Sequence, residues 1–173
     1  MAEDTPDPDS NPILDLYAHF KLSLTLSAYQ LYLSLPSFPL PPQSKRKSKA
    51  CFPLSATRIY TGQIKGKLSD GAGVSVSNDG AIHEGHYQAG KLHGRGRLID
   101  ASGSILEGEW TEGVMKGQGR IRHTEGASYV GEVYNGMPHG EGIERWEDGG
   151  YYQGNFVEGK KHGYGVFQWS RGK

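Results

Sequence analysis

One stretch of the chain comes close to a phosphate-binding loop. Residues Gly85 to Leu92 read GHYQAGKL, which matches G-x-x-x-x-G-K-[ST] except that Leu92 replaces the hydroxyl residue that would bind magnesium. The same spacing of glycine and lysine recurs at Gly154, in GNFVEGKK. The loop also requires a helix after it, and the residues that follow do not predict one. We therefore interpret this stretch as the turn of a repeated unit.

Three histidines occupy equivalent positions, each directly before a glycine: His93, His139 and His162. A metal ion would need their ring nitrogens at about 2.1 Å. In a sheet of repeated hairpins, equivalent residues of adjacent units lie two strands apart, roughly 10 Å. The spacing therefore predicts no metal site, and nothing else in the chain indicates a cofactor.

Acidic side chains gather around Trp110, namely Glu107, Glu109 and Glu112. Paired carboxylates can serve as general acid and base, but only where a pocket excludes water and tunes their pKa values. Acids recur at these offsets along the chain, and no such pocket is indicated. No Ser/His/Asp or Cys/His arrangement stands out either, so we expect a protein that is not an enzyme.

Composition narrows the class of protein further. The 173 residues include 19 basic and 19 acidic side chains, a net charge of +0 that disfavours a nucleic-acid binder. A single cysteine excludes an intrachain disulfide framework, and Leu22–Leu40 carries too many polar residues for a membrane-spanning helix. The acidic start, MAEDTPDPDS, is atypical of a secretory signal. We expect a cytoplasmic protein, with import into a plastid or mitochondrion, and removal of about 55 residues, as the alternative.

Glycine has a regular distribution. All 26 glycines lie between Gly62 and Gly172, about twice the ordinary usage for the whole chain. They recur every 23 residues through five units, 60–82, 83–105, 106–128, 129–151 and 152–173. Four columns are complete: Gly62, Gly85, Gly108, Gly131 and Gly154; Gly71, Gly94, Gly117, Gly140 and Gly163; Gly73, Gly96, Gly119, Gly142 and Gly165; Gly80, Gly103, Gly126, Gly149 and Gly172.

Each unit reads as one β-hairpin. Large side chains stand two residues before and two after the first glycine, as in Tyr129-x-Gly131-x-Val133, and a period of two places them on one face of a strand. Five or six polar, glycine-rich residues such as NGMPHG then indicate a turn before the second strand. The prediction is an all-β fold: an elongated, single-layer antiparallel sheet of ten strands, roughly 48 Å long.

A single layer leaves the aromatic face of the sheet without a second layer to cover it. We expect the glycine columns to form the floor of a groove, with aromatic side chains as its walls, that binds a peptide or helix of a partner protein. The alternative is that these rings only support the sheet itself. The open last strand also predicts weak self-association. The predicted contact residues are Tyr87, Trp110, Tyr129, Tyr152, Phe156 and Trp169.

Residues 1–56 precede the repeats and differ from them. They are acidic at first, then rich in Leu, Ser and Pro, and we expect them to be partly disordered. Within Ile13–Phe38 the periodicity fits a helix or a strand equally well. A basic cluster follows, expected to be a loop, which predicts attraction to anionic phospholipid, with a solvated linker or part of a targeting segment as alternatives. Its members are Lys45, Arg46, Lys47 and Lys49.

The repeats resemble the MORN (membrane occupation and recognition nexus) family, whose consensus is close to Y-x-G-x-[WF]-x-x-G-x-x-x-G-x-G. The matching segments are YVGEVYNGMPHGEG, YQGNFVEGKKHGYG and LEGEWTEGVMKGQG, and the resemblance covers 60–173. His83 and Leu106 depart from the tyrosine position, and Ile64 and Val133 from the aromatic position. The resemblance implies a non-catalytic scaffold or adaptor, peripheral to a membrane or the cytoskeleton. Similar arrays precede lipid kinase and lysine methyltransferase domains, so a regulatory fragment of such an enzyme is the alternative.

Overall fold

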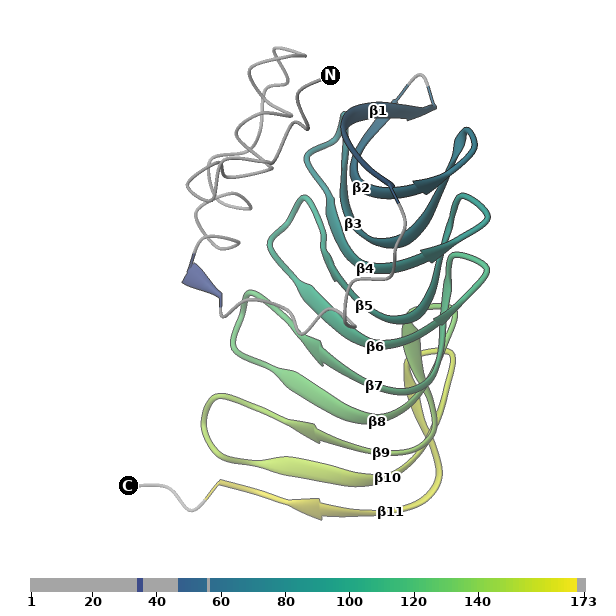
Figure 1. Cartoon of the computed structure of the whole chain (residues 1–173). Helices are drawn as coiled ribbons and strands as arrows, with labels where there is room; N and C mark the ends of the chain where they lie inside the picture. The colour runs from purple at the N-terminus through teal and green to yellow at the C-terminus, as the bar shows by residue number, and fades with distance from the viewer. Residues whose placement is uncertain (1–33, 36–46, 56, 171–173) are drawn as a thin grey trace.

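A computed structural model describes residues 34–35, 47–55 and 57–170, with side chains from Pro53 onward in the sheet. The chain forms one antiparallel sheet whose eleven strands follow one another in sequence order, which confirms the all-β prediction (Figure 1). The strands are β1 Lys47–Ser55, β2 Arg58–Lys65, β3 Leu68–Ser77, β4 Ile82–Gln88, β5 Lys91–Ile99, β6 Ile105–Thr111, β7 Val114–Arg122, β8 Ser128–Tyr134, β9 Met137–Arg145, β10 Tyr151–Val157 and β11 Lys160–Gln168.

Strand β1 adds to the ten strands predicted from the repeats. It pairs with β2 in a register that joins Lys47 to Ile64 and Lys49 to Gly62, so the expectation of a loop was wrong for these two lysines. The physical reason is the edge that β2 would otherwise present, with a row of backbone groups open to pairing. Pro53 fits an outermost strand because proline has no N–H to donate to a ladder.

The turns within the hairpins are tighter than the sequence suggested. Two residues connect β10 to β11, and both have positive φ: 48° at Glu158 and 77° at Gly159. This is the type I′ conformation, whose twist suits a two-residue hairpin. The amide of Gly159 also donates to the Pro138 carbonyl of the preceding hairpin at 2.9 Å. Equivalent turns tie the other units together, because Gly90, Gly113 and Gly136 donate to Ser69, Leu92 and Met115.

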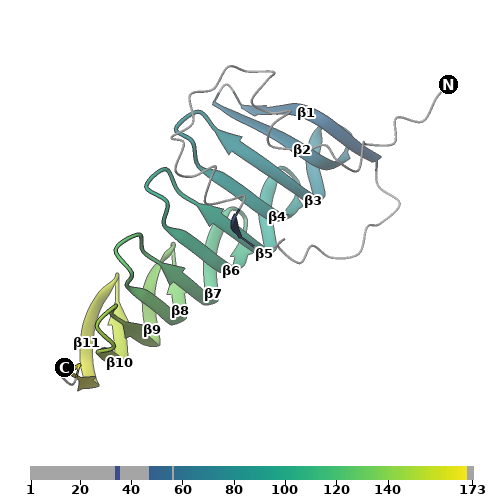
Figure 2. The same ribbon diagram turned by 90° about the vertical axis from the view of Figure 1, so that its left-hand side faces the viewer.

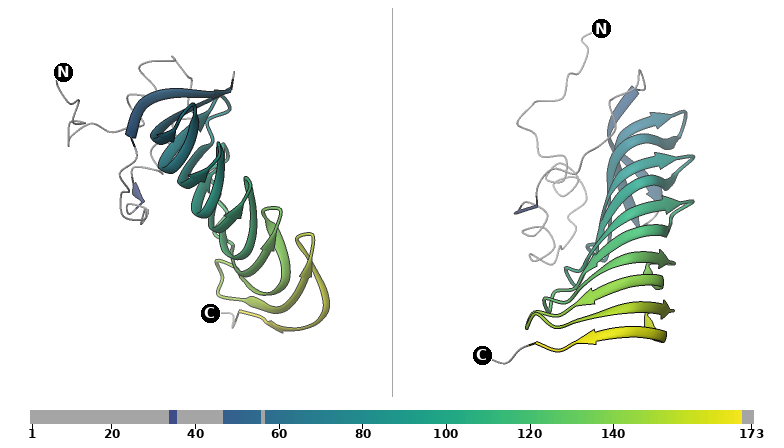
Figure 3. Two further views of the ribbon diagram at one scale, coloured as in Figure 1. Left: turned by 45° about the vertical axis from the view of Figure 1, so that its right-hand side comes forward. Right: turned by 90° about the horizontal axis from the view of Figure 1, so that it is seen from below.

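The glycines of the first and third columns form a continuous line across ten strands. Each is the register partner of the next: Gly62, Gly73, Gly85, Gly96, Gly108, Gly119, Gly131, Gly142, Gly154 and Gly165. Beside this line every hairpin has a register shift, where the second strand gains two residues on the first. Such β-bulges bend and twist a strand. The result is an elongated stack from β1 to β11 (Figure 2), in which each strand curves along its length (Figure 3).

Tyrosine rings occupy the space that the glycines leave. A Cβ atom at Gly142 would overlap the ring of Tyr129, and one at Gly165 would overlap the ring of Tyr152. The Tyr129 hydroxyl donates to the Glu132 carbonyl at 2.6 Å, three residues along the same strand. Desolvation of this hydroxyl raises the pKa of Tyr129 to about 12. The glycine line is therefore covered by the chain's own side chains on its aromatic face, and it is not the floor of an open groove there.

Candidate protein-binding site

The aromatic side chains predicted to contact a partner lie mostly in the core. Five of the six are buried, at 5% exposure or less, and they pack against one another: Tyr87, Trp110, Tyr129, Tyr152 and Phe156. Only Trp169 is exposed, at 75%. The rings of Tyr129 and Phe156 meet edge to face at 5.0 Å, and those of Tyr60 and Tyr87 at 4.9 Å. A partner cannot reach the five buried residues unless the sheet opens, so these rings support the sheet.

Two repeats lack the tyrosine and fill its space differently. In the repeat that carries Leu106, the terminal methyl of Met115 lies over Gly108 and Gly119. In the repeat that carries His83, the indole of Trp110 lies over Gly96 and 6.2 Å from the imidazole. Each departure from the consensus is thus compensated by a large side chain from a neighbouring strand.

The opposite face of the sheet carries a different row of side chains, one residue away from the glycine line. Each member of this row is the register partner of the next one on the neighbouring strand. The row consists of Glu84, Arg97, Glu107, Arg120, Val130, Ile143, Gln153 and Val166. Its first part is ionic, since the Arg97 guanidinium lies 2.6 Å from Glu84 and 3.7 Å from Glu107. Its last part, from Val130 onward, is largely apolar.

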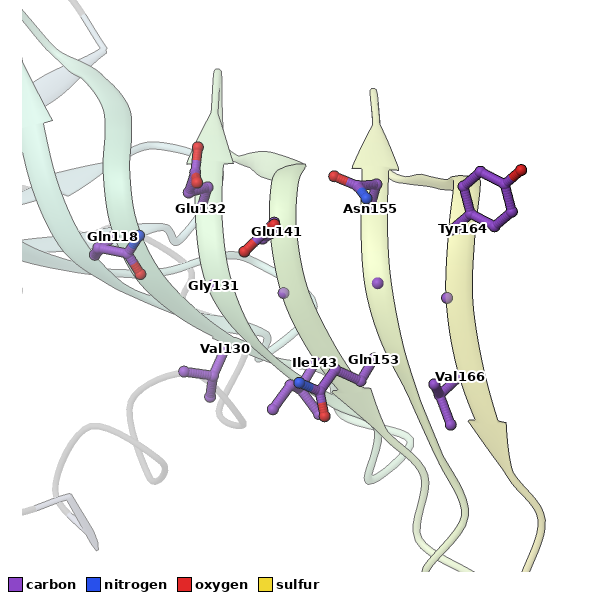
Figure 4. Close-up of a pocket in the computed structure, with 13 residues that line it drawn as sticks. Gln118, Val130, Gly131, Glu132, Glu141, Ile143, Gln153, Asn155, Tyr164 and Val166 are labelled. Atoms are coloured by element: carbon purple, nitrogen blue, oxygen red, sulfur yellow. The ribbon is translucent and has the colours of Figure 1, made fainter.

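An open groove of about 880 Å³ lies over this last part, on β7 to β11. Figure 4 shows its side chains in two rows on either side of the glycine positions. One row holds Val130, Ile143, Gln153 and Val166, and the other holds Glu132, Glu141, Asn155 and Tyr164. Backbone at Gly131, Gly142, Gly154 and Gly165 lies between them. The glycine line thus forms the base of a groove, but on the face opposite the aromatic core.

The two walls of the groove differ in chemistry. The apolar wall is accessible, with Val130 48% and Val166 61% exposed. The other wall presents the exposed carboxylates of Glu132 and Glu141 beside Tyr164, which is 95% exposed. Sequence reasoning missed this site because it followed the aromatic positions. Period two along SYVGEVY would have placed Val130 on the opposite face, where an apolar residue is unexpected.

The phosphate-loop-like segment, the possible metal ligands and the basic cluster were the other candidate sites in the sequence. Lys91 of the phosphate-loop-like segment lies in β5, with its ammonium 3.7 Å from Glu112 of the next hairpin. Over the part of the chain that the structure describes, no group of His, Cys, Asp or Glu side chains is arranged to hold a metal ion. Nor does any helix in that part have the length and apolar character needed to cross a membrane. Lys45 and Arg46 lie outside the described residues, and lipid contact by the basic cluster remains a prediction.

Comparison with known proteins agrees with this architecture. The MORN repeat family matches the chain at residues 83–105, 107–127, 129–151 and 152–173, which together make up more than half of it. The chain therefore belongs to the MORN repeat family. Such repeats are typically non-catalytic modules, often with a role in binding or as a scaffold. Among curated proteins, none matches closely enough to be a relative.

The first repeat is outside the family match but shares the geometry of the others. Gly62 pairs with Gly73, and the Tyr60 ring covers both, as the Tyr129 ring covers Gly131 and Gly142. The Tyr60 hydroxyl donates to the Gln63 carbonyl at 2.8 Å, again three residues along the strand. Five hairpins therefore form the array, although the first has diverged most in sequence.

Proposed function

We propose that this protein is a non-catalytic adaptor whose groove on β7 to β11 binds a basic amphipathic segment of a partner protein. The observation that supports this proposal is the pair of unlike walls along one groove. An amphipathic segment can place apolar residues on Val130, Ile143 and Val166 while its lysines or arginines face Glu132 and Glu141. The core rings of the other face are buried, whereas Val130 and Val166 give this groove an apolar surface that a partner can reach.

Charge decides which partner the groove selects. Acidic segments would meet two carboxylates across the groove, and juxtaposed like charges disfavour a complex. The glycine backbone between the walls allows close approach, since no side chain rises from it on this face. The proposed ligand is thus defined by chemistry: one apolar stripe with basic residues along its flank.

A peptide titration tests this proposal. The probe is an 18-residue fluorescent peptide of Leu and Lys in a helical amphipathic pattern, and fluorescence anisotropy reports binding to the full chain. We expect Glu132→Lys combined with Glu141→Lys to weaken binding at least tenfold, because two attractive contacts become repulsive. A matching peptide of Leu and Glu should bind the wild-type protein poorly.

The repeat supplies a control for this titration. Glu109 occupies the position equivalent to Glu132 one unit earlier, is exposed, and lies outside the groove. Glu109→Lys changes the net charge by the same amount as either single substitution but should leave affinity within a factor of two. Equal losses for Glu109→Lys and Glu132→Lys would show only a general charge effect. Unchanged binding by the double variant would reject the groove as the site.

A further inference from the structure

A lysine ammonium sits among aromatic rings at the carboxyl-terminal end of the array. The Lys161 Nζ lies 5.1 Å from the centroid of Trp146, 5.5 Å from that of Tyr152 and 5.9 Å from that of Phe167. It also forms an ion pair with the Glu144 carboxylate. Three ring faces and one carboxylate around a cation are the components of an aromatic cage. We call this group the cation cage.

Stacking holds the rings of the cage in place. The Phe167 ring is parallel to that of Trp146, with centroids 5.9 Å apart and 8° between planes. Phe167 also stacks on Trp169, with centroids 5.3 Å apart and 18° between planes. Tyr152 completes the arrangement, its ring 4.9 Å from Phe167. Because these contacts are between the rings themselves, they do not depend on the lysine.

The repeat shows that the cage is a departure from the rest of the array. Positions equivalent to Lys161 in the second and third units are Leu92 and Met115, both buried in the core. Positions equivalent to Glu144 in those units are Leu98 and Ile121, also apolar and packed in the core. Lys161 and Glu144 therefore place a cation and an anion at two positions where the second and third units have apolar core residues.

A third column changes with them. Trp146 occupies the position of Asp100 and His123 in the second and third units. An aromatic ring has thus replaced polar residues at the point where the ammonium lies. If these changes served only to end the apolar core at the last repeat, a single solvent-exposed charged residue would be enough and no aromatic ring would be needed. The three departures together place a cation among aromatic rings and beside a carboxylate.

We propose that the cation cage binds a methylated lysine side chain of a partner protein, and that Lys161 occupies the cage until that ligand displaces it. A trimethylammonium group carries the same charge as Lys161 but is held less strongly by water, so it gains more from the ring faces. The Lys161 side chain is one-third exposed and can swing into solvent. This inference is independent of the groove on β7 to β11, which lies on the other face.

The chemistry near the cage favours lysine over a choline headgroup. Choline lipids carry a phosphate beside the quaternary ammonium, whereas a methylated lysine carries an alkyl stem. Glu144 is inside the cage, and the turn after Trp146 presents the exposed acids Glu147 and Asp148. These carboxylates repel a phosphate but not an alkyl chain.

Tryptophan fluorescence of the full chain tests the cage. The probes are a short peptide with one trimethyllysine and the same peptide with a neutral tert-butyl isostere in place of the ammonium. We expect the wild-type protein to bind the trimethyllysine peptide at millimolar concentration and Lys161→Ala to bind it at least tenfold more tightly, because the internal competitor is gone. The neutral isostere should bind neither protein detectably.

Two variants separate cage binding from a general effect. Lys161→Met copies Met115 of the third unit, fills the cage with a neutral side chain, and should abolish binding without loss of the fold. Trp146→Ala added to Lys161→Ala should return affinity to or below the wild-type value. Circular dichroism establishes that each variant is folded, and the wild-type comparison of the two peptides needs no variant at all.

Several results would contradict binding of methyllysine by the cation cage. The proposal is overturned if the wild-type protein does not distinguish the two peptides, if Lys161→Ala gives no gain, or if Lys161→Met binds as Lys161→Ala does. Phosphocholine is the third probe. Binding of phosphocholine as tight as that of the trimethyllysine peptide would overturn the assignment to a protein partner and identify a lipid headgroup as the ligand.

Discussion

Replacement of Gly142 by alanine should lower the free energy of unfolding by about 3 kcal/mol, the upper part of the range for an overpacked core. The added methyl would overlap the Tyr129 ring. That ring cannot move aside easily, since it is buried at 1% exposure and its hydroxyl donates to the Glu132 carbonyl. Backbone conformation is not the cause, because Gly142 does not have positive φ. Urea unfolding monitored by circular dichroism measures the loss.

The array contains a matched control for this substitution. Gly119 stands at the same place one unit earlier, but the nearest atom to its added methyl is the terminal methyl of Met115. Methionine is flexible, but the next contact, Val133 Cγ2 at 2.9 Å, is stiffer, so Gly119→Ala should cost about 1 to 2 kcal/mol, less than Gly142→Ala. Combining Gly142→Ala with Tyr129→Leu, which copies Leu106, should cost less than the sum of the two. Equal costs at Gly142 and Gly119, together with strict additivity, would disprove the account of the glycine line.

Acidification should destabilise the protein through His83. Desolvation at this partly buried site, with Arg58 nearby, lowers the pKa of His83 to about 4, despite the opposing effect of Asp79. The unfolded chain takes up a proton near pH 6.5, whereas the folded chain does so only near pH 4. Between these values the unfolded state binds more protons, so stability falls as pH falls. We expect His83 to account for a loss of about 2 to 3 kcal/mol from pH 7.5 to pH 4.

The control is His83→Leu, which copies Leu106 at the equivalent position of the next unit. Other histidines and the carboxylates titrate in both proteins, so the difference between the two isolates His83. We expect the variant to lose about 2 kcal/mol less than the wild-type protein over the same pH interval, by urea unfolding at each pH. Parallel pH dependence of the two proteins would mean that His83 is not kept neutral by the fold.

Much of the fold was predictable because the spacing of residues within each repeat indicates how the strands are arranged. The 23-residue period showed where each hairpin begins and ends. The alternation in Tyr129-x-Gly131-x-Val133 showed which side chains share a face. The complete glycine columns indicated their line across the sheet. These features depend on local periodicity and on the absence of Cβ atoms, both of which are visible in the sequence.

The openness of each face was not predictable in the same way. Whether a ring beside Gly142 stands as the wall of a groove or lies over the glycine depends on how far the strand bends. That bend comes from the bulges next to the glycine line, and these depend on pairing between strands. Spacing alone therefore left the roles of Tyr129 and Phe156 open, as contact residues or as support for the sheet.

Two local features needed the structure for other reasons. Glu112 and Glu158 adopt positive φ in two-residue turns, a conformation that glutamate disfavours and that only the paired strands around it impose. Strand β1 belongs to no repeat, so the periodicity of the sequence could not predict it. The apolar wall at Val130 and Ile143 was hidden for a simpler reason, since its residues alternate with the conspicuous aromatic ones.

The central claim is that the aromatic face of the array is closed and the opposite face is open. Hydroxyl-radical footprinting of the full chain, read by mass spectrometry, tests it without any substitution. Two pairs of identical residues divide between the closed and the open face: Met115 with Met137, and Tyr129 with Tyr164. The account predicts that the second member of each pair oxidises many times faster. Similar rates for Tyr129 and Tyr164, and for Met115 and Met137, would contradict it.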